Sequence, residues 1–430
     1  MDKARICIIG AGPSGIGAAK SLLEAGLGDL IVFDKNDRVG GNWIFDPRPG
    51  HSSVYETTHA ISSRRLSQYE GFDMPGDYPD YPSHVQLQRY FASYADNFRV
   101  TAHVRFGTEV TAAVPQGDGG WLVSASGPSG KETTRFDFLL VANGHHWDPR
   151  LPSYPGEFTG PIIHAHSFKS AAPFAGQRVL VIGGGNSACD IAVEIGRVAR
   201  QCCISMRRGY YFFPKFLFGR PIDLLGRRIS RLPWPIRQRI AKYALRLTQG
   251  TNHRYGLPEP DHQPLEQHPT LNSELLYAIR HGRVMPRPDV ARFAGQQVQF
   301  ADGRRETFDT VIAATGYNMT FPFLDPALID LSEASGLPLY LNVFHPRLRS
   351  LYFIGLVQPV GCIWPLAELQ GKIVAREIKG SWTRPADIEA RIRQQSERSL
   401  FRKAKSHRHL IEVDHHIYLR QLEHELRKAA

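Results

Sequence analysis

A glycine-rich stretch near the start of the chain, GAGPSG, has the residue types and spacing that bind a pyrophosphate. Gly10, Gly12 and Gly15 fit the pattern GxGxxG. The first glycine permits a tight turn, the second lets the pyrophosphate approach the backbone, and the third lets helix and strand pack closely. The stretch follows the apolar run RICII and opens a helix-like segment, whose N-terminus would offer N–H groups to phosphates. A second apolar run ends in Asp34, about 20 residues further on, where a carboxylate would hold ribose hydroxyls.

A second stretch, GGGNSA, repeats this arrangement in the middle of the chain. Gly183 and Gly185 take the first two glycine positions, and Ala188, which is still small enough for close packing, takes the third. The strand that follows ends in Arg207 and Arg208, where the first unit has a carboxylate. Arginine suits a 2′-phosphate through bidentate charged hydrogen bonds, so the second stretch is predicted to bind NADPH. A solvated basic turn is the alternative interpretation of the two arginines.

The segment KNDRVGGNW comes directly after Asp34. Its glycines Gly40 and Gly41 would let the chain pass close to a flat or charged group, and Trp43 could cover that group. A turn beside a core tryptophan is the simpler alternative. The position just after the ribose carboxylate favours a longer dinucleotide, and we expect FAD in the first unit.

Two further segments are near copies of each other: FDFLLVANGHH, residues 136–146, and FDTVIAATGYN, residues 308–318. Each predicts an apolar strand that ends in a glycine turn near a crossing between two domains. An internal repeat of this kind makes a chance match of the glycine patterns improbable.

The order of these motifs predicts an α/β protein with two dinucleotide-binding, Rossmann-like domains, and 430 residues suffice for two. We expect an NADPH-binding domain, residues 156–324, inserted into a split FAD-binding domain, residues 1–155 plus 325–430. Short linkers are expected around Pro152 and Pro322.

The composition is that of an ordinary soluble protein, 42% hydrophobic and 22% charged, which excludes extensive disorder. Five scattered cysteines form no CxxC pair and indicate a reducing compartment. The chain enters a strand-like run at once, which leaves no room for a signal peptide, and contains no apolar run of 18 residues. A cytoplasmic location is therefore expected.

The net charge of +11 is compatible with binding to nucleic acid or to an anionic membrane, and also with binding of phosphorylated cofactors. No nucleic-acid-binding module is recognisable, so no nucleic-acid partner is expected. The segment 215–247 has nine Lys or Arg residues and one acid, Asp223. Its stretch IRQRIAKYALRL places apolar residues near one helical face, so the insert 215–250 could contact a membrane, cap the active site or pack between domains.

A further motif lies between the two glycine stretches, in FTGPIIHAHSF. Phe158, Gly160, His164 and Phe168 match the pattern FxGxxxHxxx(F/Y), and Lys169 follows. With the ATGY turn and the segment FIGLVQPVGCIWPLAELQ, residues 353–370, this motif resembles the flavin-containing monooxygenases, which are class B flavoprotein monooxygenases. The resemblance covers nearly the whole chain. Lys169 stands where the Baeyer–Villiger sister group usually has Trp-Pro.

Within that family the middle region is similar to the plant-type enzymes that oxidatively decarboxylate indole-3-pyruvate. The shared features are the long insert and the stretch RYGLPEPDHQPL, residues 254–265. The closing segment HLIEVDHHIYLRQL resembles bacterial members.

The glycine stretches, the strand ends and the matching family positions together give the candidate cofactor-binding residues. These are Gly10, Gly12, Pro13, Ser14, Gly15, Asp34, Lys35, Gly41, Asn42, Trp43, Val110, Ala142, Asn143, Gly144, Gly183, Gly185, Asn186, Ser187, Ala188, Asp190, Arg207, Arg208, Ala314, Thr315, Gly316, Tyr317 and Gln358.

The resemblance implies an enzyme in which NADPH reduces FAD, dioxygen forms a C4a-(hydro)peroxyflavin, and a small organic substrate takes one oxygen atom. That substrate would be a soft nitrogen or sulfur nucleophile, or a keto or carbonyl compound. Many members have an asparagine near the flavin where this chain has Ile61, although the plant-type group also lacks it. Ile61, the adjacent Ser62 and His59, a candidate proton donor or an ordinary loop histidine, are the candidate catalytic residues.

Three alternatives remain open at this point. A disulfide reductase would share the two-cofactor plan, but the adjacent Cys202 and Cys203 match its cysteine pair poorly. An uncoupled NADPH oxidase releasing hydrogen peroxide is favoured by Ile61, and a non-catalytic NADPH-binding flavoprotein is the third. His164 and His166 lack further ligands at metal spacing, so we expect no metal and a linker-positioning role. Substrate and oligomeric state, monomer or homodimer, stay open.

Overall fold

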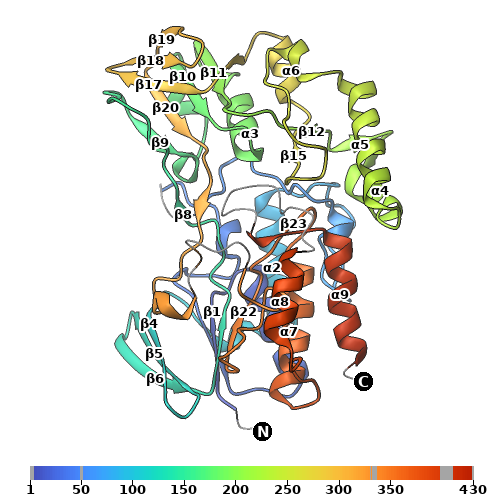
Figure 1. The fold of residues 1–430 in the computed structure, drawn as a ribbon. Coiled ribbons are helices and arrows are strands. Elements are labelled where there is room, and N and C mark those ends of the chain that lie inside the picture. Colours follow the sequence, from blue (N-terminus) through green and yellow to red (C-terminus); the bar gives the residue numbers. More distant parts are fainter. Residues whose placement is uncertain (1–3, 49–51, 330, 332–336, 398–409, 429–430) are drawn as a thin grey trace. The chain divides into compact units, whose positions relative to one another are not determined.

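The computed structural model describes residues 4–48, 52–329, 331, 337–397 and 410–428 (Figure 1). The chain divides into two compact units. Unit 1 comprises residues 1–44, 62–145 and 319–430, and unit 2 comprises residues 45–61 and 146–318.

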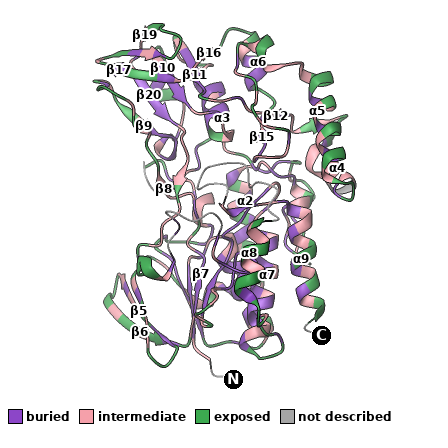
Figure 2. Ribbon diagram, viewed as in Figure 1, coloured by how far each residue is buried: buried purple, intermediate pink, exposed green. Residues whose placement is uncertain are grey.

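Unit 1 is built on a five-stranded parallel sheet in the order β22–β7–β1–β2–β3. Its strands are β1 (Ile6–Ile9), β2 (Leu30–Phe33), β3 (Val104–Arg105), β7 (Phe138–Val141) and β22 (Leu351–Phe353). The central strands are almost fully buried, as their continuous apolar runs require in a parallel sheet covered on both faces (Figure 2).

The helices of unit 1 are α1 (Pro13–Glu24), α2 (His84–Asn97), α7 (Trp364–Ile378), α8 (Ile388–Glu397) and α9 (His415–Lys428). Helix α2 starts with a capping box, in which the Ser83 side chain accepts from the Gln86 N–H and the Gln86 side chain accepts from the Ser83 N–H. A second, antiparallel sheet contains β4 (Glu109–Pro115), β5 (Trp121–Gly127) and β6 (Gly130–Phe136). β23 (Gln358–Pro359) pairs with β24 (Glu412–Val413). Single 3-10 turns are η1 (Gly41–Trp43), η2 (Arg64–Leu66), η3 (Thr101–His103) and η7 (Pro326–Leu328).

Unit 2 repeats the plan with a parallel sheet in the order β16–β11–β10–β20–β9. Its strands are β9 (Ile162–His164), β10 (Arg178–Ile182), β11 (Gln201–Ser205), β16 (Met285–Arg287) and β20 (Thr310–Ala313). The helices are α3 (Asn186–Ile195), α4 (Ile222–Ile229), α5 (Trp234–Gln249) and α6 (Leu275–Arg280), with 3-10 turns η4 (Ala165–Ser167), η5 (Ala172–Phe174) and η6 (Asn252–Tyr255).

Smaller sheets complete unit 2. An antiparallel sheet contains β17 (Val290–Ala294), β18 (Gln297–Phe300) and β19 (Arg305–Thr307). The pairs are β8 (Asp148–Pro149) with β21 (Tyr317–Asn318), β12 (Phe212–Phe213) with β15 (Thr270–Leu271), and β13 (Phe216–Leu217) with β14 (Arg220–Pro221).

The predicted α/β class with parallel sheets is confirmed, but the limits of the units differ from the expected domain limits. The chain leaves unit 1 after His145 and returns after Asn318, rather than at residues 155 and 325. Residues 45–61 also belong to unit 2. Within unit 2 the Tyr55 ring packs 5.3 Å from that of Phe168, centroid to centroid. A local sequence pattern does not reveal such a long-range contact.

Candidate functional site

In unit 1 the turn between β1 and α1 has room for backbone but not for side chains. Gly10 has φ 110°, and a Cβ there would lie 2.5 Å from the Ala142 carbonyl oxygen; a Cβ on Gly15 would collide with the Gly10 carbonyl. Gly12 forms the N-cap of α1 with φ −70° and ψ 176°, and no side chain caps the helix. The helix N-terminus therefore lacks an internal side-chain partner, as expected for a phosphate-binding turn.

The backbone of Gly41 also lies close to this turn. Gly41 has φ 54°, and a Cβ there would lie 2.8 Å from the Gly12 Cα. The Trp43 ring then packs edge-on against Trp364 at the start of α7, 5.8 Å between centroids. Glycine at position 41 thus serves a left-handed turn and a close contact between two loops.

The Asp34 carboxylate lies buried at the end of β2, next to the glycine turn. Its Oδ2 accepts a hydrogen bond from the Ala11 N–H (2.6 Å), and its Oδ1 accepts one from the Asn36 N–H (2.7 Å). The Thr108 N–H donates to the Asp34 carbonyl, which ties the strand end to β4 and its buried Val110. The structure places Asp34 where the sequence pattern expected it, while Lys35 is exposed.

Unit 2 reproduces this turn almost residue for residue. Gly183 has φ 138°, and a Cβ there would lie 2.5 Å from the Ala314 carbonyl oxygen. Gly185 forms the N-cap of α3 with φ −80° and ψ 179°, again without a side-chain cap, and Ala188 is fully buried. β7 lies beside β1 and β20 lies beside β10, so the sequence repeat is also a geometric repeat.

The arginine pair follows β11, as predicted. Arg207 is exposed, and the Arg208 guanidinium lies 5.6 Å from the ring centroid of Tyr210. A side chain on Gly184 would collide with the Tyr210 ring, which therefore lies over the glycine turn. Tyr210 was not among the predicted residues, although an aromatic residue next to RRG was a usable signal.

Two predicted cofactor residues on α3 instead have partners inside unit 2. Asn186 Oδ1 accepts from the Leu271 N–H (2.7 Å), and Asp190 Oδ1 accepts from Asn272 Nδ2 (2.5 Å). The Tyr55 hydroxyl also hydrogen-bonds to Asp190. Desolvation raises the pKa of the Asp190 carboxyl to about 6. Both side chains attach α3 to its neighbours, and Ser187 is exposed.

The return segment of unit 1 passes the first turn. Gly355 has φ 74°, and any side chain there would collide with Ser14 at the start of α1. In the same unit Gln358 Oε1 lies 3.1 Å from His145 Nε2, and Asn143 Nδ2 donates to the Thr320 carbonyl (3.2 Å). Gln358 and Asn143 were among the predicted cofactor-binding residues. Gly355 was not, although it lies in the stretch FIGLVQ that also contains Gln358.

The neutral side chain of His164 binds the ATGY turn of unit 2. Its Nδ1 accepts from the His166 N–H (3.1 Å), so its Nε2–H is the donor to the Gly316 carbonyl (3.0 Å). Burial lowers the pKa of His164 to about 4, in agreement with that tautomer. Arg150 Nη2 donates to the Thr315 carbonyl (2.9 Å), and the Tyr317 ring lies against His146, His164 and His166. These contacts support a positioning role for the motif histidine.

The candidate catalytic residues lie where the chain passes from unit 2 back to unit 1, between Ile61 and Ser62. Ser62 is buried, with its Oγ 2.8 Å from Ser67 Oγ. His59 is exposed in unit 2, and its Nδ1 lies 2.8 Å from the Thr57 carbonyl oxygen. Across the described ranges, no group of three His, Cys, Asp or Glu side chains is arranged to hold a metal ion.

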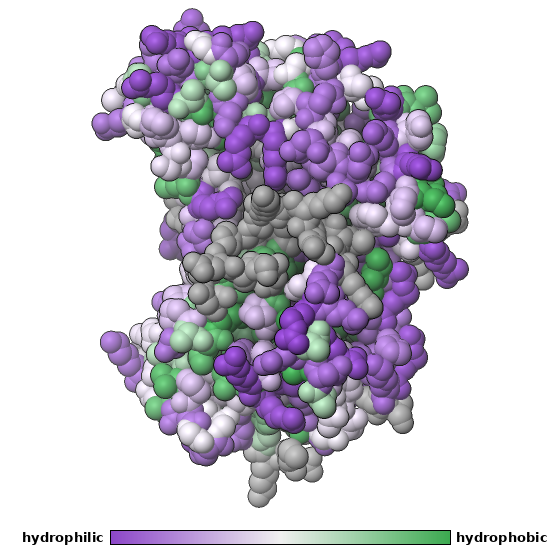
Figure 3. All heavy atoms as spheres, viewed as in Figure 1, coloured by the Kyte–Doolittle hydropathy of each residue, from purple (hydrophilic) through white to green (hydrophobic). Residues whose placement is uncertain are grey.

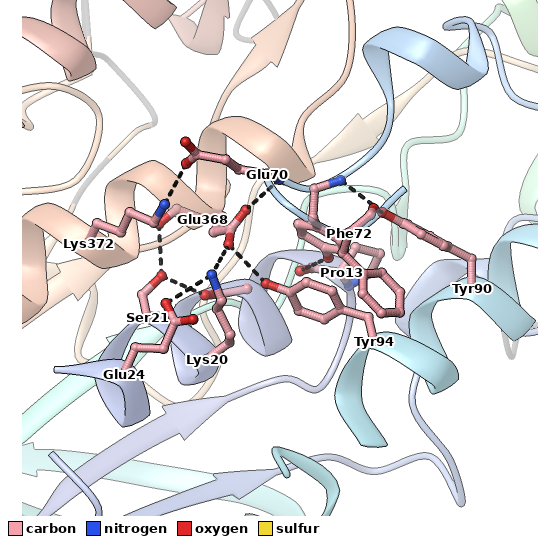
Figure 4. Close-up of polar contacts among 12 residues, drawn as sticks. Pro13, Lys20, Ser21, Glu24, Glu70, Phe72, Tyr90, Tyr94, Glu368 and Lys372 are labelled. Carbon is pink, nitrogen blue, oxygen red and sulfur yellow. Dashed lines mark hydrogen bonds and ion pairs between the residues drawn. The ribbon is translucent and has the colours of Figure 1, made fainter. Parts of the chain in front are cut away.

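Sequence reasoning missed a buried ion pair under the first turn (Figure 4). Lys20 Nζ on α1 lies 2.7 Å from Glu368 Oε1 on α7, and both residues are at most 5% exposed. The Tyr94 hydroxyl donates to Oε1 (3.1 Å) and the Glu70 N–H to Oε2 (3.3 Å). A lysine inside the apolar pattern GIGAAKSLLEAG was the available signal. The network joins the first glycine turn's helix to α7.

Both units contain a glycine turn between a buried parallel strand and a helix, and the residues that follow the neighbouring strands β2 and β11 have opposite charge. Residues 3–428 match the family model for flavin-binding monooxygenase-like proteins. Flavin-containing monooxygenase 5 of Homo sapiens is 36% identical over 436 residues, covering 96% of this chain and 81% of that protein. The chain belongs to the flavin-binding monooxygenase-like family.

Solved structures show the same fold. S-allyl-L-cysteine S-oxygenase from Allium sativum superposes with a TM-score of 0.73 at 23% identity, covering 98% of this chain and 88% of that one. Cyclohexanone monooxygenase from Rhodococcus sp. Phi1 bound to NADP+ gives a TM-score of 0.68 at 19% identity, covering 91% and 88%. The protein is therefore an NADPH-dependent FAD monooxygenase, and the predicted family, enzyme class and cofactors are confirmed.

Proposed function

We propose that unit 1 binds FAD and unit 2 binds NADPH, so that the FAD-binding part is split in sequence by an inserted NADPH-binding part. The observation that carries this assignment is a repeated backbone geometry combined with opposite charges. Gly12 and Gly185 cap their helices with the same conformation, whereas Asp34 follows β2 and Arg207 and Arg208 follow β11. A carboxylate binds ribose hydroxyls and repels a 2′-phosphate, and arginine binds that phosphate.

The chain's own residues bind and orient the two cofactors. The N–H groups at the starts of α1 and α3 would hold the pyrophosphates, and the missing side chains of the helix-capping Gly12 and Gly185 would let each pyrophosphate approach the backbone. Trp43 and Trp364 supply an aromatic wall in unit 1. His164, held neutral, keeps the turn at 314–317 fixed in unit 2. FAD itself supplies the redox and oxygen chemistry when bound.

The substrate class follows from the same proposal. A small organic molecule with a soft nitrogen or sulfur atom, or a keto or carbonyl compound, would take one oxygen atom from dioxygen, and NADPH would reduce the other to water. The names of the two solved neighbours, an S-oxygenase and a cyclohexanone monooxygenase, represent these two classes. Ile61, Ser62 and His59 are the residues we propose to act nearest the reaction, with His59 as the proton donor.

A balance of NADPH consumed, hydrogen peroxide released and product formed tests this proposal. The panel contains an aryl thioether, a tertiary amine, cyclohexanone and phenylpyruvate. The proposal expects at least one compound to give product close to one per NADPH, with little peroxide. Peroxide equal to NADPH for every compound would instead favour the uncoupled oxidase.

The Ile61→Asn variant sharpens the same assay, because asparagine restores the polar side chain that many family members have there. We expect Ile61→Asn to lower the peroxide fraction, whereas the isosteric control Ile61→Leu should leave it unchanged. Equal peroxide fractions in both variants would show that Ile61 does not control coupling.

A further inference from the structure

The exterior of unit 2 is polar, and Lys169 is buried beneath it. Figure 3 shows hydrophilic residues over most of the visible face of this unit, which Figure 1 locates by its strands β17 to β19. None of the described helices in either unit is long and apolar enough to cross a bilayer. Lysine normally lies at such a polar surface with its ammonium group in water. Lys169 is instead only 9% exposed, so the burial of its charge needs a reason.

The Lys169 side chain binds the backbone of residues 52–56. Its ammonium group donates to the Ser52 carbonyl and to the Val54 carbonyl, the latter at 3.2 Å. In return, the Glu56 N–H donates to the Lys169 carbonyl (2.9 Å). Three hydrogen bonds therefore attach a segment that lies far away in the sequence to the residue that directly follows the motif FxGxxxHxxx(F/Y).

Two other motifs of unit 2 bind side chains of the same segment. The Tyr55 ring packs 5.3 Å from that of Phe168, centroid to centroid, and the Tyr55 hydroxyl hydrogen-bonds to Asp190 on α3. The Tyr317 hydroxyl of the ATGY turn hydrogen-bonds to Ser53. The end of the FxGxxxHxxx(F/Y) motif, the helix after the second glycine turn and the ATGY turn thus all contact one short segment.

This segment leads directly to the residues that we propose to act nearest the reaction. The Thr58 N–H donates to the Tyr55 carbonyl (2.9 Å), and the Tyr55 N–H donates to Thr58 Oγ1 (2.9 Å), so the chain forms a tight turn here. His59 follows the turn immediately, and Ile61 comes two residues later. Each residue extends a chain by at most about 3.6 Å. A shift of the turn is therefore transmitted to Ile61.

The charge of Lys169 is explained by this contact. Burial lowers the pKa of the Lys169 ammonium group, and the Asp46 carboxylate partly offsets that shift. An ammonium group has three donors and can bind two carbonyls that lie two residues apart. An apolar side chain would leave both carbonyls without this donor, at the cost of desolvated backbone groups.

We propose that Lys169 is a positioning residue of the reaction, which fixes the backbone of residues 52–56 on unit 2 and thereby sets where His59 and Ile61 lie. The proposal rests on the proposed function for the role of His59 and Ile61. The attachment of residues 52–56 by Lys169 is independent of the cofactors and of the substrate.

The variant Lys169→Met tests the proposal in the full-length holoenzyme, because methionine keeps a long apolar side chain but removes the donor. Hydrogen exchange measured by mass spectrometry should become faster in the peptide that contains Glu56 and Thr58, and should stay unchanged in the rest of unit 2. Anaerobic stopped-flow mixing with NADPH should show a limiting rate of flavin reduction that is roughly 10–100-fold lower, because the reacting groups are misaligned. The NADPH concentration that gives half of this rate should change by less than about twofold, because binding is not affected.

A rescue variant and a matched control make the result specific. Lys169→Arg should recover part of the reduction rate, because a guanidinium group can also donate to two carbonyls. Arg384→Met is the control in unit 1, where Arg384 is 7% exposed and donates to the carbonyls of His345, Leu348 and Arg349. This control should lower the thermal midpoint without changing the limiting rate of flavin reduction.

A milder variant covers the case in which Lys169→Met does not fold. Tyr55→Phe removes only the hydroxyl that hydrogen-bonds to Asp190 and keeps the ring against Phe168. It should lower the limiting rate roughly 2–10-fold, the value of one hydrogen bond, with the same concentration of NADPH at half of that rate.

Three results would overturn the proposal. Unchanged exchange in Lys169→Met would show that the lysine does not fix the segment. Faster exchange with an unchanged reduction rate would show that the segment does not position the reaction, and an equal fall of the rate in Arg384→Met would show a general loss of stability. Failure of the proposed function is a different result: NADPH would then not reduce the flavin of the unsubstituted protein, and the role of Ile61 would fall with it.

Discussion

Replacing Lys20 by methionine tests the buried ion pair that joins α1 to α7. Methionine keeps the length and apolar body of the side chain but removes the ammonium group, which lies 2.7 Å from Glu368 Oε1. Glu368, 1% exposed, would keep only its neutral hydrogen bonds, from the Tyr94 hydroxyl and the Glu70 N–H. Water cannot compensate a carboxylate at that depth.

The expected loss follows from this burial. Leaving one partner of a buried pair uncompensated costs about 3–5 kcal/mol of the free energy of unfolding. At roughly 2–4 °C per kcal/mol for a unit of this size, the thermal midpoint of unit 1 should fall by roughly 6–20 °C. Near-ultraviolet circular dichroism and release of bound flavin on heating both measure that midpoint.

Two further variants make the result specific. Lys20→Met with Glu368→Gln should recover much of the loss, because it removes both buried charges while the amide oxygen can still accept from the Tyr94 hydroxyl. Lys372→Met breaks the neighbouring pair with Glu70, whose side chains are 27% and 71% exposed, and should cost less than about 1 kcal/mol. A loss of stability in Lys20→Met no larger than that in Lys372→Met, or a double variant less stable than the single one, would refute the role of the buried ion pair.

Two predictions concern unit 2. Arg207→Gln with Arg208→Gln should raise the KM for NADPH relative to that for NADH by roughly 10–100-fold, the value of one or two charged hydrogen bonds; an unchanged ratio in steady-state kinetics would contradict it. Asp190 has a folded-state pKa raised to about 6, so its contribution to stability is greatest below about pH 4 and is lost as pH rises through 6. Asp190→Asn should remove this loss, of the order of 2–3 kcal/mol, from unfolding curves between about pH 4 and pH 7; parallel pH profiles would refute the assignment.

The sequence predicted the features that depend on local pattern. A glycine at positive φ between a strand and a helix is visible as GxGxxG, and both turns form where that pattern places them. The opposite charges of Asp34 and of Arg207 and Arg208 are likewise visible in the sequence, because the aspartate and the arginine pair each directly follow an apolar run that predicts a strand. The two near-copy segments predicted two apolar strands, and these form as β7 and β20; the structure adds that they lie beside β1 and β10.

The features that were missed depend on contacts between distant segments. Residues 45–61 join unit 2 because Tyr55 packs against Phe168 and the Glu56 N–H donates to the Lys169 carbonyl. The ion pair between Lys20 and Glu368 joins residues that are 348 positions apart in the sequence. Neither follows from periodicity. The hydrogen bond from Asn272 Nδ2 to the Asp190 carboxylate also joins segments that are distant in the sequence.

The central claim, FAD in unit 1 and NADPH in unit 2, is tested most directly with the matched variants Gly12→Ala and Gly185→Ala. Both backbones have dihedral angles that alanine adopts, and a Cβ on Gly12 would lie no closer than 3.5 Å to its nearest neighbour. Each variant should therefore fold, with a methyl group where a pyrophosphate must approach.

The measurement is flavin content followed by anaerobic titration with NADPH, observed as bleaching of the flavin absorbance. We expect Gly12→Ala to lose most of its FAD, whereas Gly185→Ala should keep its FAD but require far more NADPH for bleaching. Loss of FAD in Gly185→Ala with normal FAD content in Gly12→Ala would contradict it.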